Sequence, residues 1–447
     1  MNRVFIKTYG CQMNERDSEA VAFKLKARGY EIVSDEEIAD VVLLNTCSVR
    51  DQAEQKAIGK AGHLAHRKKK NQKFIFGVMG CMAQNRGEEL FDILPDLDLV
   101  VGTQKFHRIP EYLDKITGST EPKTTNIIDL EDEEFSQEEI RDHLDTSQNK
   151  VTAFVSIMQG CNMNCTFCIV PKTRGKERYR SIASITKEVE ELVDRGVREV
   201  TLLGQIVNAY GRGLLPRIDN KTPFVQLLEK LNEIEGLYRI RFTSPHPTSF
   251  GDDLIECFAR LPKLCEHAHL PMQSGSDRIL KLMNRPYTRK KFLAITKKLR
   301  NAHSKMRIST DVILGFPGES DDDYALTKSA FIEATFEMAY IFKYSERSGT
   351  PAVELSDSVP KEVKEMRNQD LLSQLEKQSY TSNSSSVGKR YEVLVEGKAK
   401  RGKGMLIGRT RCNRRVVFEG NQALAGELLD IEIKDVSVTT LIGTHKP

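Results

Sequence analysis

No stretch of about 18 or more apolar residues occurs in this chain of 447 residues, so the sequence predicts no membrane-spanning helix. The first residues, MNRVFIKTYGC, also lack a charged segment followed by an apolar one and a cleavage site, which predicts no secretory signal. We therefore expect a cytoplasmic protein, in which thiols stay reduced. Under these conditions the nine cysteines indicate metal ligation or buried thiols rather than disulfides.

A cysteine cluster near the middle of the chain lacks a fourth ligand. Cys161, Cys165 and Cys168 follow the spacing C-x3-C-x2-C, and no further cysteine or histidine lies nearby. Structural zinc takes four protein ligands, so zinc would need a distant residue here. Haem attachment requires a histidine directly after the last cysteine, where Ile169 stands. Thiolates at this density favour an iron–sulfur cubane with one open iron, which can bind a substrate.

A large excess of charge is also missing, since the formal net charge is only +4. Residues 384–447 nevertheless hold 12 Lys and Arg against 7 Asp and Glu, concentrated in KAKRGKG and RTRCNRR. Short strand patterns separated by glycines predict a small all-β barrel or sandwich there, and a barrel with such a basic rim indicates single-stranded nucleic-acid binding. A solvated basic surface is the alternative. The basic runs 66–70 and 285–291 could extend such a surface along a phosphate backbone.

Three further cysteines follow β-rich apolar runs in an N-terminal region that alternates strand and helix patterns. Cys11, Cys47 and Cys81 end the runs NRVFIKTYGC, ADVVLLNTC and KFIFGVMGC, and LDLVVG reads as a further strand. Alternating strands and helices predict a parallel sheet, in which all carboxyl ends meet at one edge. Each cysteine alone favours a buried thiol, whereas three at equivalent positions favour a shared ligand.

The chain as a whole is predicted to be α/β with three domains. Six strand patterns, spaced by amphipathic segments, predict an incomplete (β/α)6 barrel over 147–383, with strand-end polar residues at its mouth. An N-terminal parallel-sheet domain over 1–128 precedes it, joined by an acidic linker over 129–146. The segment SNSSSVGKR reads as a second linker, before the all-β barrel over 384–447.

The motif CNMNCTFC resembles the signature of the radical S-adenosylmethionine superfamily. TYGCQMNERDSE, NTCSVR, GCMAQ, CTFCIVPKTRG, LPMQSGSDRILKLMNRPYT and TDVILGFPGE together resemble the methylthiotransferases of that superfamily. The similarity runs the whole length, including a C-terminal segment similar to the RNA-binding TRAM domain. It departs at Ile206, where the family usually has Asn, and at Lys172, where it usually has Tyr.

The resemblance implies a [4Fe-4S] cluster on Cys161, Cys165 and Cys168 that cleaves S-adenosylmethionine. It implies a second, sulfur-donating [4Fe-4S] cluster on the other cysteine triplet, with two S-adenosylmethionine molecules used per turnover. Further cofactor contacts are expected from the residue that precedes the third motif cysteine and from strand ends of the barrel: Phe167, Gly204, Gln205, Gln273 and Asp311. A core role is the alternative for Phe167.

Within the family, the motifs are most similar to those of enzymes that modify tRNA. The implied reaction is methylthiolation of C2 of N6-isopentenyladenosine at position 37, next to the anticodon. Expected partners are the tRNA anticodon stem-loop, a reducing electron donor and cluster-assembly or repair factors, around a monomeric enzyme. Two alternatives use the same chemistry, on threonylcarbamoyl-adenosine in tRNA or on a ribosomal-protein aspartate. A third is a non-catalytic RNA-binding iron–sulfur sensor.

Overall fold

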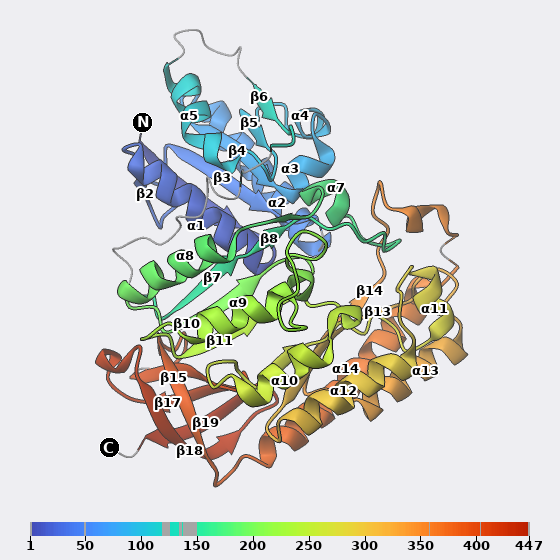
Figure 1. Cartoon of the computed structure of the whole chain (residues 1–447). Helices are drawn as coiled ribbons and strands as arrows, with labels where there is room; N and C mark the ends of the chain where they lie inside the picture. The colour runs from blue at the N-terminus through green and yellow to red at the C-terminus, as the bar shows by residue number, and fades with distance from the viewer. Residues whose placement is uncertain are drawn as a thin grey trace. The chain divides into compact units, whose positions relative to one another are not determined.

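The chain forms two compact units (Figure 1). The computed structural model describes residues 2–48, 51–118, 126–133, 136, 150–356, 358–402 and 404–445. The first unit comprises Met1–Gln148, Met158–Asn164 and Cys168–Arg180, and the second comprises Asn149–Ile157, Cys165–Phe167 and Ser181–Pro447. The domain borders predicted at residues 128, 146 and 383 stay predictions, and most of the predicted acidic linker lies outside the described residues.

The first unit is built on a parallel sheet, as predicted. Its strand order is β2-β1-β3-β4-β5-β6, with every neighbouring pair parallel. The order reverses at β1, because the chain passes from β1 to β2 on one side and then to β3 on the other. The four predicted strands are present and two short ones were missed. The strands are β1 (Arg3–Thr8), β2 (Glu31–Ile32), β3 (Val41–Thr46), β4 (Ile75–Gly80), β5 (Leu99–Val101) and β6 (Ile127–Asp129).

Helices cover both faces of this sheet because the central strands are apolar on both faces. In β3, Val41 and Leu43 face one core and Val42 and Leu44 face the other. The first core includes residues of α1 (Gln12–Ala27), η1 (Phe106–Arg108) and α5 (Ile109–Gly118). The second includes residues of α2 (Asp51–Lys70), α3 (Cys81–Arg86) and α4 (Glu89–Ile93).

The segment around the C-x3-C-x2-C motif adds a small hairpin to the first unit. Strand β8 (Met158–Gln159) pairs antiparallel with β9 (Arg178–Tyr179), and α7 (Val170–Arg174) lies between them in sequence. The Thr103 hydroxyl donates to the Thr173 carbonyl at 2.7 Å. Bonds of this kind hold the chain just after the motif against the carboxyl edge of the sheet.

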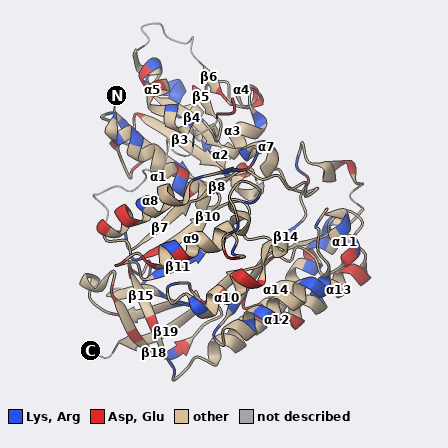
Figure 2. Cartoon of the chain, in the orientation of Figure 1, with Lys and Arg blue, Asp and Glu red and all other residues tan. Residues whose placement is uncertain are grey.

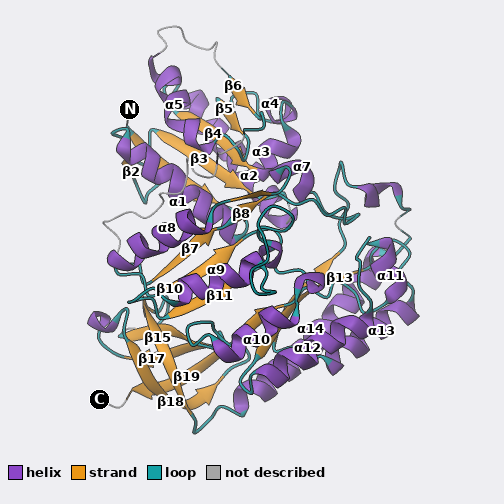
Figure 3. Ribbon diagram, in the orientation of Figure 1, coloured by secondary structure: helices purple, strands orange, loops and turns teal. Residues whose placement is uncertain are grey.

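The second unit contains the predicted incomplete (β/α)6 barrel (Figure 3). Six parallel strands form two three-stranded sheets, β11-β10-β7 and β12-β13-β14, which one bridge between Ile240 and Leu264 links. The strands are β7 (Thr152–Ser156), β10 (Glu199–Leu203), β11 (Arg239–Phe242), β12 (His267–His269), β13 (Arg307–Leu314) and β14 (Met338–Lys343). The helices are α8 (Ile182–Asp194), α9 (Pro223–Asn232), α10 (Asp252–Arg260), α11 (Asp277–Leu282), α12 (Arg289–Ala302) and α13 (Asp321–Glu333), with single turns η2 (Val207–Ala209), η3 (Pro247–Ser249) and η4 (Pro351–Glu354).

The predicted C-terminal β structure is a closed barrel in the order β15-β16-β17-β19-β18. Its interior is aliphatic apart from Phe418, and alternation along each strand supplies the core. No helix in the described part of the chain is long and apolar enough to cross a membrane. The elements are β15 (Arg390–Lys398), β16 (Met405–Thr410), β17 (Arg415–Glu419), η5 (Gln422–Leu424), β18 (Leu428–Val436) and β19 (Thr440–His445).

The linker predicted at SNSSSVGKR is wrong. Helix α14 (Lys361–Ser384) continues through its first residues, and Asn383 is 2% exposed. The Asn383 amide donates to the carbonyls of Ser437 and Val438, each at 3.0 Å. A serine-rich composition resembles a linker, but here the small polar side chains hydrogen-bond the neighbouring barrel.

Buried arginines join the C-terminal barrel to the larger barrel within the second unit. Arg239 and Arg241 point from β11 and donate to backbone carbonyls at the end of β16 and just beyond it, on Arg409, Thr410 and Arg411. Figure 2 shows acidic and basic residues interspersed in both units, which agrees with the small net charge.

Candidate functional site

The structure brings Cys11, Cys47 and Cys81 together at the carboxyl edge of the first sheet. The Cys47 thiol hydrogen-bonds the Cys11 thiol, and Cys81 is near enough to interact electrostatically with Cys11. Cys47 follows β3 directly, Cys81 opens α3 after β4, and Cys11 precedes α1. The edge between β1 and β3 is the point where the strand order reverses, and ligands bind at such points in open α/β sheets.

Glycines precede two of these cysteines because a side chain would not fit. Gly10 has φ +139°, and a Cβ there would lie 2.5 Å from the Cβ of Cys47. Gly80 has φ +96°, and a Cβ there would lie 2.4 Å from Oδ1 of Asn45. The chain therefore leaves both strands through left-handed turns that bring the thiols close to each other.

A buried polar network lies under the three thiols. Asn14 and Asn45 are fully buried and bond each other, with Nδ2 of Asn14 donating to Oδ1 of Asn45 at 3.0 Å. Asn45 donates in turn to the Ser18 hydroxyl at 2.9 Å. The Cys11 thiol donates to Oδ1 of Asn14 at 3.2 Å. Amides satisfied in this way fix the local geometry without adding charge.

A buried ion pair lies beside the same thiols. Nη1 of Arg174 lies 2.7 Å from Oδ2 of Asp17, and both side chains are 3% exposed. Nη2 of Arg174 donates to Oδ1 of Asn14 at 3.4 Å, so the guanidinium joins the network under Cys11. Arg174 ends α7, whereas Asp17 and Asn14 lie one turn apart on the buried face of α1.

These surroundings change the acidity of the thiols in opposite directions. The hydrogen bond from Cys47, assisted by the Arg174 charge, lowers the pKa of Cys11 to about 6 despite burial. Burial raises the pKa of Cys81, although Arg174 opposes the shift. Burial disfavours the charged form of Arg174, but Asp17 and the thiols of Cys81 and Cys11 raise its pKa above the ordinary value.

The donor set fits an iron–sulfur cubane better than a single metal ion. Cys47 is 1% and Cys81 4% exposed, so the thiols lie in the low-dielectric setting that such clusters occupy. Among the described residues, no three His, Cys, Asp or Glu side chains are placed to hold one metal ion together. A cubane does not need that arrangement, because each thiolate binds a different iron.

The C-x3-C-x2-C motif occupies one short loop whose residues pack in different units. Cys161 belongs to the first unit, where its amide donates to the Gly175 carbonyl at 3.1 Å. Cys165 belongs to the second, where Nη1 of Arg285 donates to its sulfur at 3.3 Å. The run 285–291 was expected to be an exposed face, or part of a phosphate-binding surface together with the C-terminal barrel. It begins instead with a buried donor to a motif cysteine.

Two glutamines near the barrel's strand ends carry buried acceptors without a hydrogen-bond partner among the described residues. They are Oε1 of Gln205, just after β10, and Oε1 of Gln273, after β12. Gln273 has φ +63° and Ser244, after β11, has φ +57°, which is unusual for residues with a side chain. An ammonium or hydroxyl donor would satisfy such acceptors, and S-adenosylmethionine carries both. Gly204 is buried beside Gln205.

One face of the sheet β12-β13-β14 presents polar and aromatic side chains. Nε2 of His269 lies 3.2 Å from Oδ2 of Asp311, and Asp311 pairs in register with Tyr340. The Tyr340 and Phe342 rings are parallel, with centroids 6.4 Å apart, and are 39% and 38% exposed. The opposite face of β13 is fully buried and mostly apolar, through Ile308, Val312 and Leu314, with Thr310 between them.

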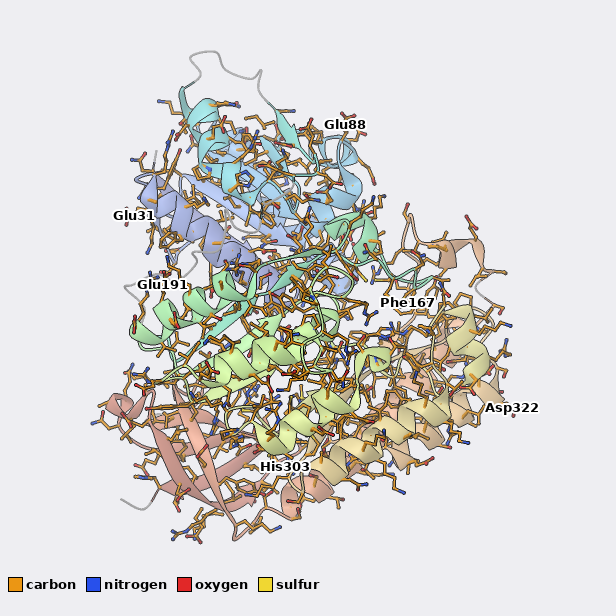
Figure 4. The ribbon with its side chains drawn as sticks, in the orientation of Figure 1. Glu31, Glu88, Phe167, Glu191, His303 and Asp322 are labelled. Carbon is orange, nitrogen blue, oxygen red and sulfur yellow. The ribbon has the colours of Figure 1, made fainter. Side chains whose placement is uncertain are left out.

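Phe167, labelled in Figure 4, packs in the second unit near that face. Its ring lies edge-on to Phe316 with centroids 6.5 Å apart, and it joins a cluster that contains Ile313. Ile313 pairs in register with Phe342. The predicted residues Phe167, Gln273 and Asp311 therefore all lie at or beside β13 of one sheet. Their roles stay predictions.

The sequence reading missed the residues that support the cysteines: Asn14, Asp17, Asn45, Arg174 and Arg285. Asn14 and Asp17 follow Cys11 by three and six residues, a spacing that places polar groups on one helix face. That spacing was a usable signal, because this face of α1 is buried. The two positions that depart from the family pattern take no part in these contacts. Ile206 is buried directly after Gln205, and Lys172 is exposed on α7.

Solved structures resemble the chain in fold. The radical S-adenosylmethionine methyltransferase TsrM from Kitasatospora setae matches with TM-score 0.55 and 12% identity, over 79% of this chain and 77% of that one. The cobalamin-dependent S-adenosylmethionine radical enzyme OxsB matches with TM-score 0.53 and 13% identity, over 82% of this chain and 56% of that one.

Family models match three parts of the chain. Residues 3–102 match the Uncharacterized protein family UPF0004, residues 155–329 the Radical SAM superfamily and residues 384–445 the TRAM domain. The second and third matches agree with the partial barrel and the closed C-terminal barrel.

Relatives named tRNA-2-methylthio-N(6)-dimethylallyladenosine synthase match over the full length. The one from Opitutus terrae is 54% identical, over 99% of this chain and 97% of its own. The one from Akkermansia muciniphila is 49% identical, over 100% of this chain and 99% of its own. The chain belongs to the family of tRNA-2-methylthio-N(6)-dimethylallyladenosine synthases.

Proposed function

We propose that this chain is a radical S-adenosylmethionine enzyme that methylthiolates C2 of N6-isopentenyladenosine in tRNA, at position 37 next to the anticodon. The observation that carries the proposal is full-length identity of 54% to a relative named for the product of this reaction. Membership of the Radical SAM superfamily implies a [4Fe-4S] cluster and S-adenosylmethionine. The TRAM match supports RNA as the partner.

We assign the two cysteine triplets to two clusters. Cys161, Cys165 and Cys168 would hold the cluster of the superfamily, and Cys11, Cys47 and Cys81 an auxiliary one. When bound, these groups supply the electron that cleaves S-adenosylmethionine to a radical and the sulfur that the product receives, with two S-adenosylmethionine molecules used per turnover. Aromatic C2–H bonds have no acidic proton, so acid–base side chains alone could not activate that carbon.

The chain's own residues bind, orient and exclude water. Gln205 and Gln273 offer buried acceptors for the ammonium or ribose hydroxyls of S-adenosylmethionine. Arg285 donates to the Cys165 sulfur and so helps to hold the position of that motif cysteine. Phe167, which precedes the third motif cysteine in sequence, packs edge-on against Phe316 and adds apolar surface in the second unit.

Nucleoside analysis tests the proposed substrate. A strain that lacks this gene should lose 2-methylthio-N6-isopentenyladenosine and accumulate N6-isopentenyladenosine, and mass spectrometry of digested tRNA measures both. Loss of the methylthiolated threonylcarbamoyl nucleoside instead would assign the alternative tRNA substrate. A mass change confined to a ribosomal protein would assign the aspartate substrate. The sensor alternative predicts unchanged nucleosides and no 5′-deoxyadenosine from the purified protein under reductant.

The exposed aromatic pair is our candidate platform for the target adenine. Tyr340 and Phe342 present parallel rings on the sheet face that also carries Asp311 and borders the Phe167 cluster. Stacking a base on an aromatic side chain contributes about 1–3 kcal/mol. Replacing both residues with alanine should therefore weaken stem-loop binding by roughly fivefold to a hundredfold. Quenching of 2-aminopurine at position 37 should disappear in that variant.

Two measurements distinguish stacking on the target adenine from other roles of Tyr340 and Phe342. Tyr380→Ala removes another exposed ring, on α14, and should leave base quenching unchanged. S-adenosylmethionine affinity, measured by calorimetry, should be unaffected in the double variant. If that affinity falls while base quenching persists, the rings stack on the adenine of S-adenosylmethionine instead.

Only some basic residues of the C-terminal barrel are available to contact RNA, because others bond to the protein itself. Arg409 and Arg411 pair with Glu396 and Glu266, and Arg414 donates to Ser382, so RTRCNRR serves mainly in protein contacts. Lys398, at the end of β15, and Lys400 and Arg401, in the turn that follows, are exposed instead. We assign the RNA-facing charge of the C-terminal barrel to this turn.

A further inference from the structure

The ion pair of Arg174 and Asp17 adds a fixed charge arrangement to the auxiliary cysteine site. Each side chain is 3% exposed, and their charged atoms lie 2.7 Å apart. Burying two charges costs several kcal/mol per ion before their attraction is counted, so such a pair is weak support for stability alone. Its position beside Cys11, Cys47 and Cys81 calls for an explanation in terms of those thiols.

Contacts connect the guanidinium to the thiols on two sides. Oδ1 of Asn14 accepts from the Cys11 thiol at 3.2 Å and from Nη2 of Arg174 at 3.4 Å. Arg174 is also near enough to Cys81 to interact with it electrostatically. The arginine therefore contacts the surroundings of two of the three thiols, whereas Asp17 lies on its far side as the counter-charge.

The sequence position of Arg174 links the two cysteine triplets. It lies six residues after Cys168, at the end of α7, and its side chain reaches the strand-end cysteines of the first sheet. All of these contacts lie within the first unit. The loop that would carry the catalytic cluster thus contributes a positive charge to the auxiliary site.

The charges of Arg174 and Asp17 would change the reduction potential of a cluster bound to these cysteines. Three thiolates outweigh the positive charge of an oxidised cubane core, so a cluster on Cys11, Cys47 and Cys81 would be an anion. Reduction adds another negative charge, and a buried neighbouring cation favours the more negative state. The net charge and hydrogen bonds around the sulfurs set the reduction potential of such clusters. Arg174 should raise that potential and Asp17 should lower it.

We propose that Arg174 and Asp17 are positioning residues that set the charge balance, and hence the reduction potential, of the auxiliary cluster. This inference rests on the proposed assignment of that cluster to Cys11, Cys47 and Cys81. The competing explanation is that the ion pair only ties the loop after the motif to α1. That explanation predicts the same effect from removing either partner, whereas ours predicts effects of opposite sign.

The test uses the full-length chain with Cys161, Cys165 and Cys168 replaced by alanine, so that only the auxiliary cluster is measured. After anaerobic reconstitution, iron content is measured and the cluster is titrated electrochemically with detection by electron paramagnetic resonance. Arg174→Gln should reduce the ratio of reduced to oxidised cluster at least tenfold at the parent midpoint, a shift of about 59 mV for one electron. Asp17→Asn should raise the ratio, and Arg174→Lys should stay close to the parent.

The outcomes separate this inference from the assignment beneath it. Shifts of the same sign in Arg174→Gln and Asp17→Asn, or no shift in either with about four irons retained, overturn the charge role and leave the cluster assignment standing. A parent that binds no iron overturns both. If Arg174→Gln does not take up iron, the sign of the shift in Asp17→Asn decides, with a lowered or unchanged potential counting against the proposal.

Discussion

A full-length variant with Cys11, Cys47 and Cys81 all replaced by alanine should bind about four irons per chain, against about eight for the parent. It should still convert S-adenosylmethionine to 5′-deoxyadenosine, because the C-x3-C-x2-C motif is intact. Methylthiolated nucleoside should fall below detection, since the thiols that would hold the donated sulfur are gone. Iron content and chromatography of the products after anaerobic reconstitution measure all three.

The reciprocal variant supplies the matched control. Replacing Cys161, Cys165 and Cys168 should also leave about four irons, but it should abolish 5′-deoxyadenosine. Cys257→Ala should keep about eight irons, because that buried thiol donates to the Asp253 carbonyl within α10. Methylthiolation by the Cys11, Cys47 and Cys81 variant would show that the inserted sulfur comes from elsewhere.

Sequence patterns sufficed for the longer strands and for the edge at which the N-terminal cysteines meet, but not for short strands such as β2 and β6. Each of those cysteines ends an apolar run, and parallel strands bring such ends to one edge whatever the helices do. The strands of the C-terminal barrel were predictable for a similar reason, because alternating runs separated by glycines need no long-range information. The same runs also fitted a sandwich, and the structure shows the closed barrel. Both predictions depend on periodicities that local sequence sets.

Residues that act through long-range contacts were not predictable. Arg174 reaches Asp17 across 157 positions, and Arg285 reaches Cys165 across 120. Composition assigned Arg285 to a solvated or phosphate-binding run, because charge in a sequence does not reveal burial. The serine-rich segment before the C-terminal barrel misled in the opposite direction, since small polar side chains suit a hydrogen-bonded helix end as well as a linker.

Arg241→Met should lower the stability of the second unit. Nε of Arg241 lies 2.9 Å from Oε1 of Glu199, and the two side chains are 7% and 5% exposed. Removing the arginine leaves the buried Glu199 carboxylate with only the longer contact to Nη1 of Arg239, at 3.9 Å. Breaking a buried pair by removing one partner costs about 3–5 kcal/mol, and the remaining arginine should reduce this loss. It also removes the donors to the Thr410 and Arg411 carbonyls. The midpoint of urea unfolding, followed by circular dichroism, should fall accordingly.

A double variant distinguishes the buried charge from lost packing. Arg241→Met with Glu199→Gln removes both charges, so it should recover part of the stability that Arg241→Met loses. Lys230→Ala breaks the exposed pair with Glu233 and should leave the midpoint unchanged. Proteolysis should cut the C-terminal barrel from Arg241→Met faster than from the double variant, because this arginine holds the end of β16 to β11. Equal destabilisation in the single and double variants would mean that packing, rather than the unpaired carboxylate, dominates at this contact.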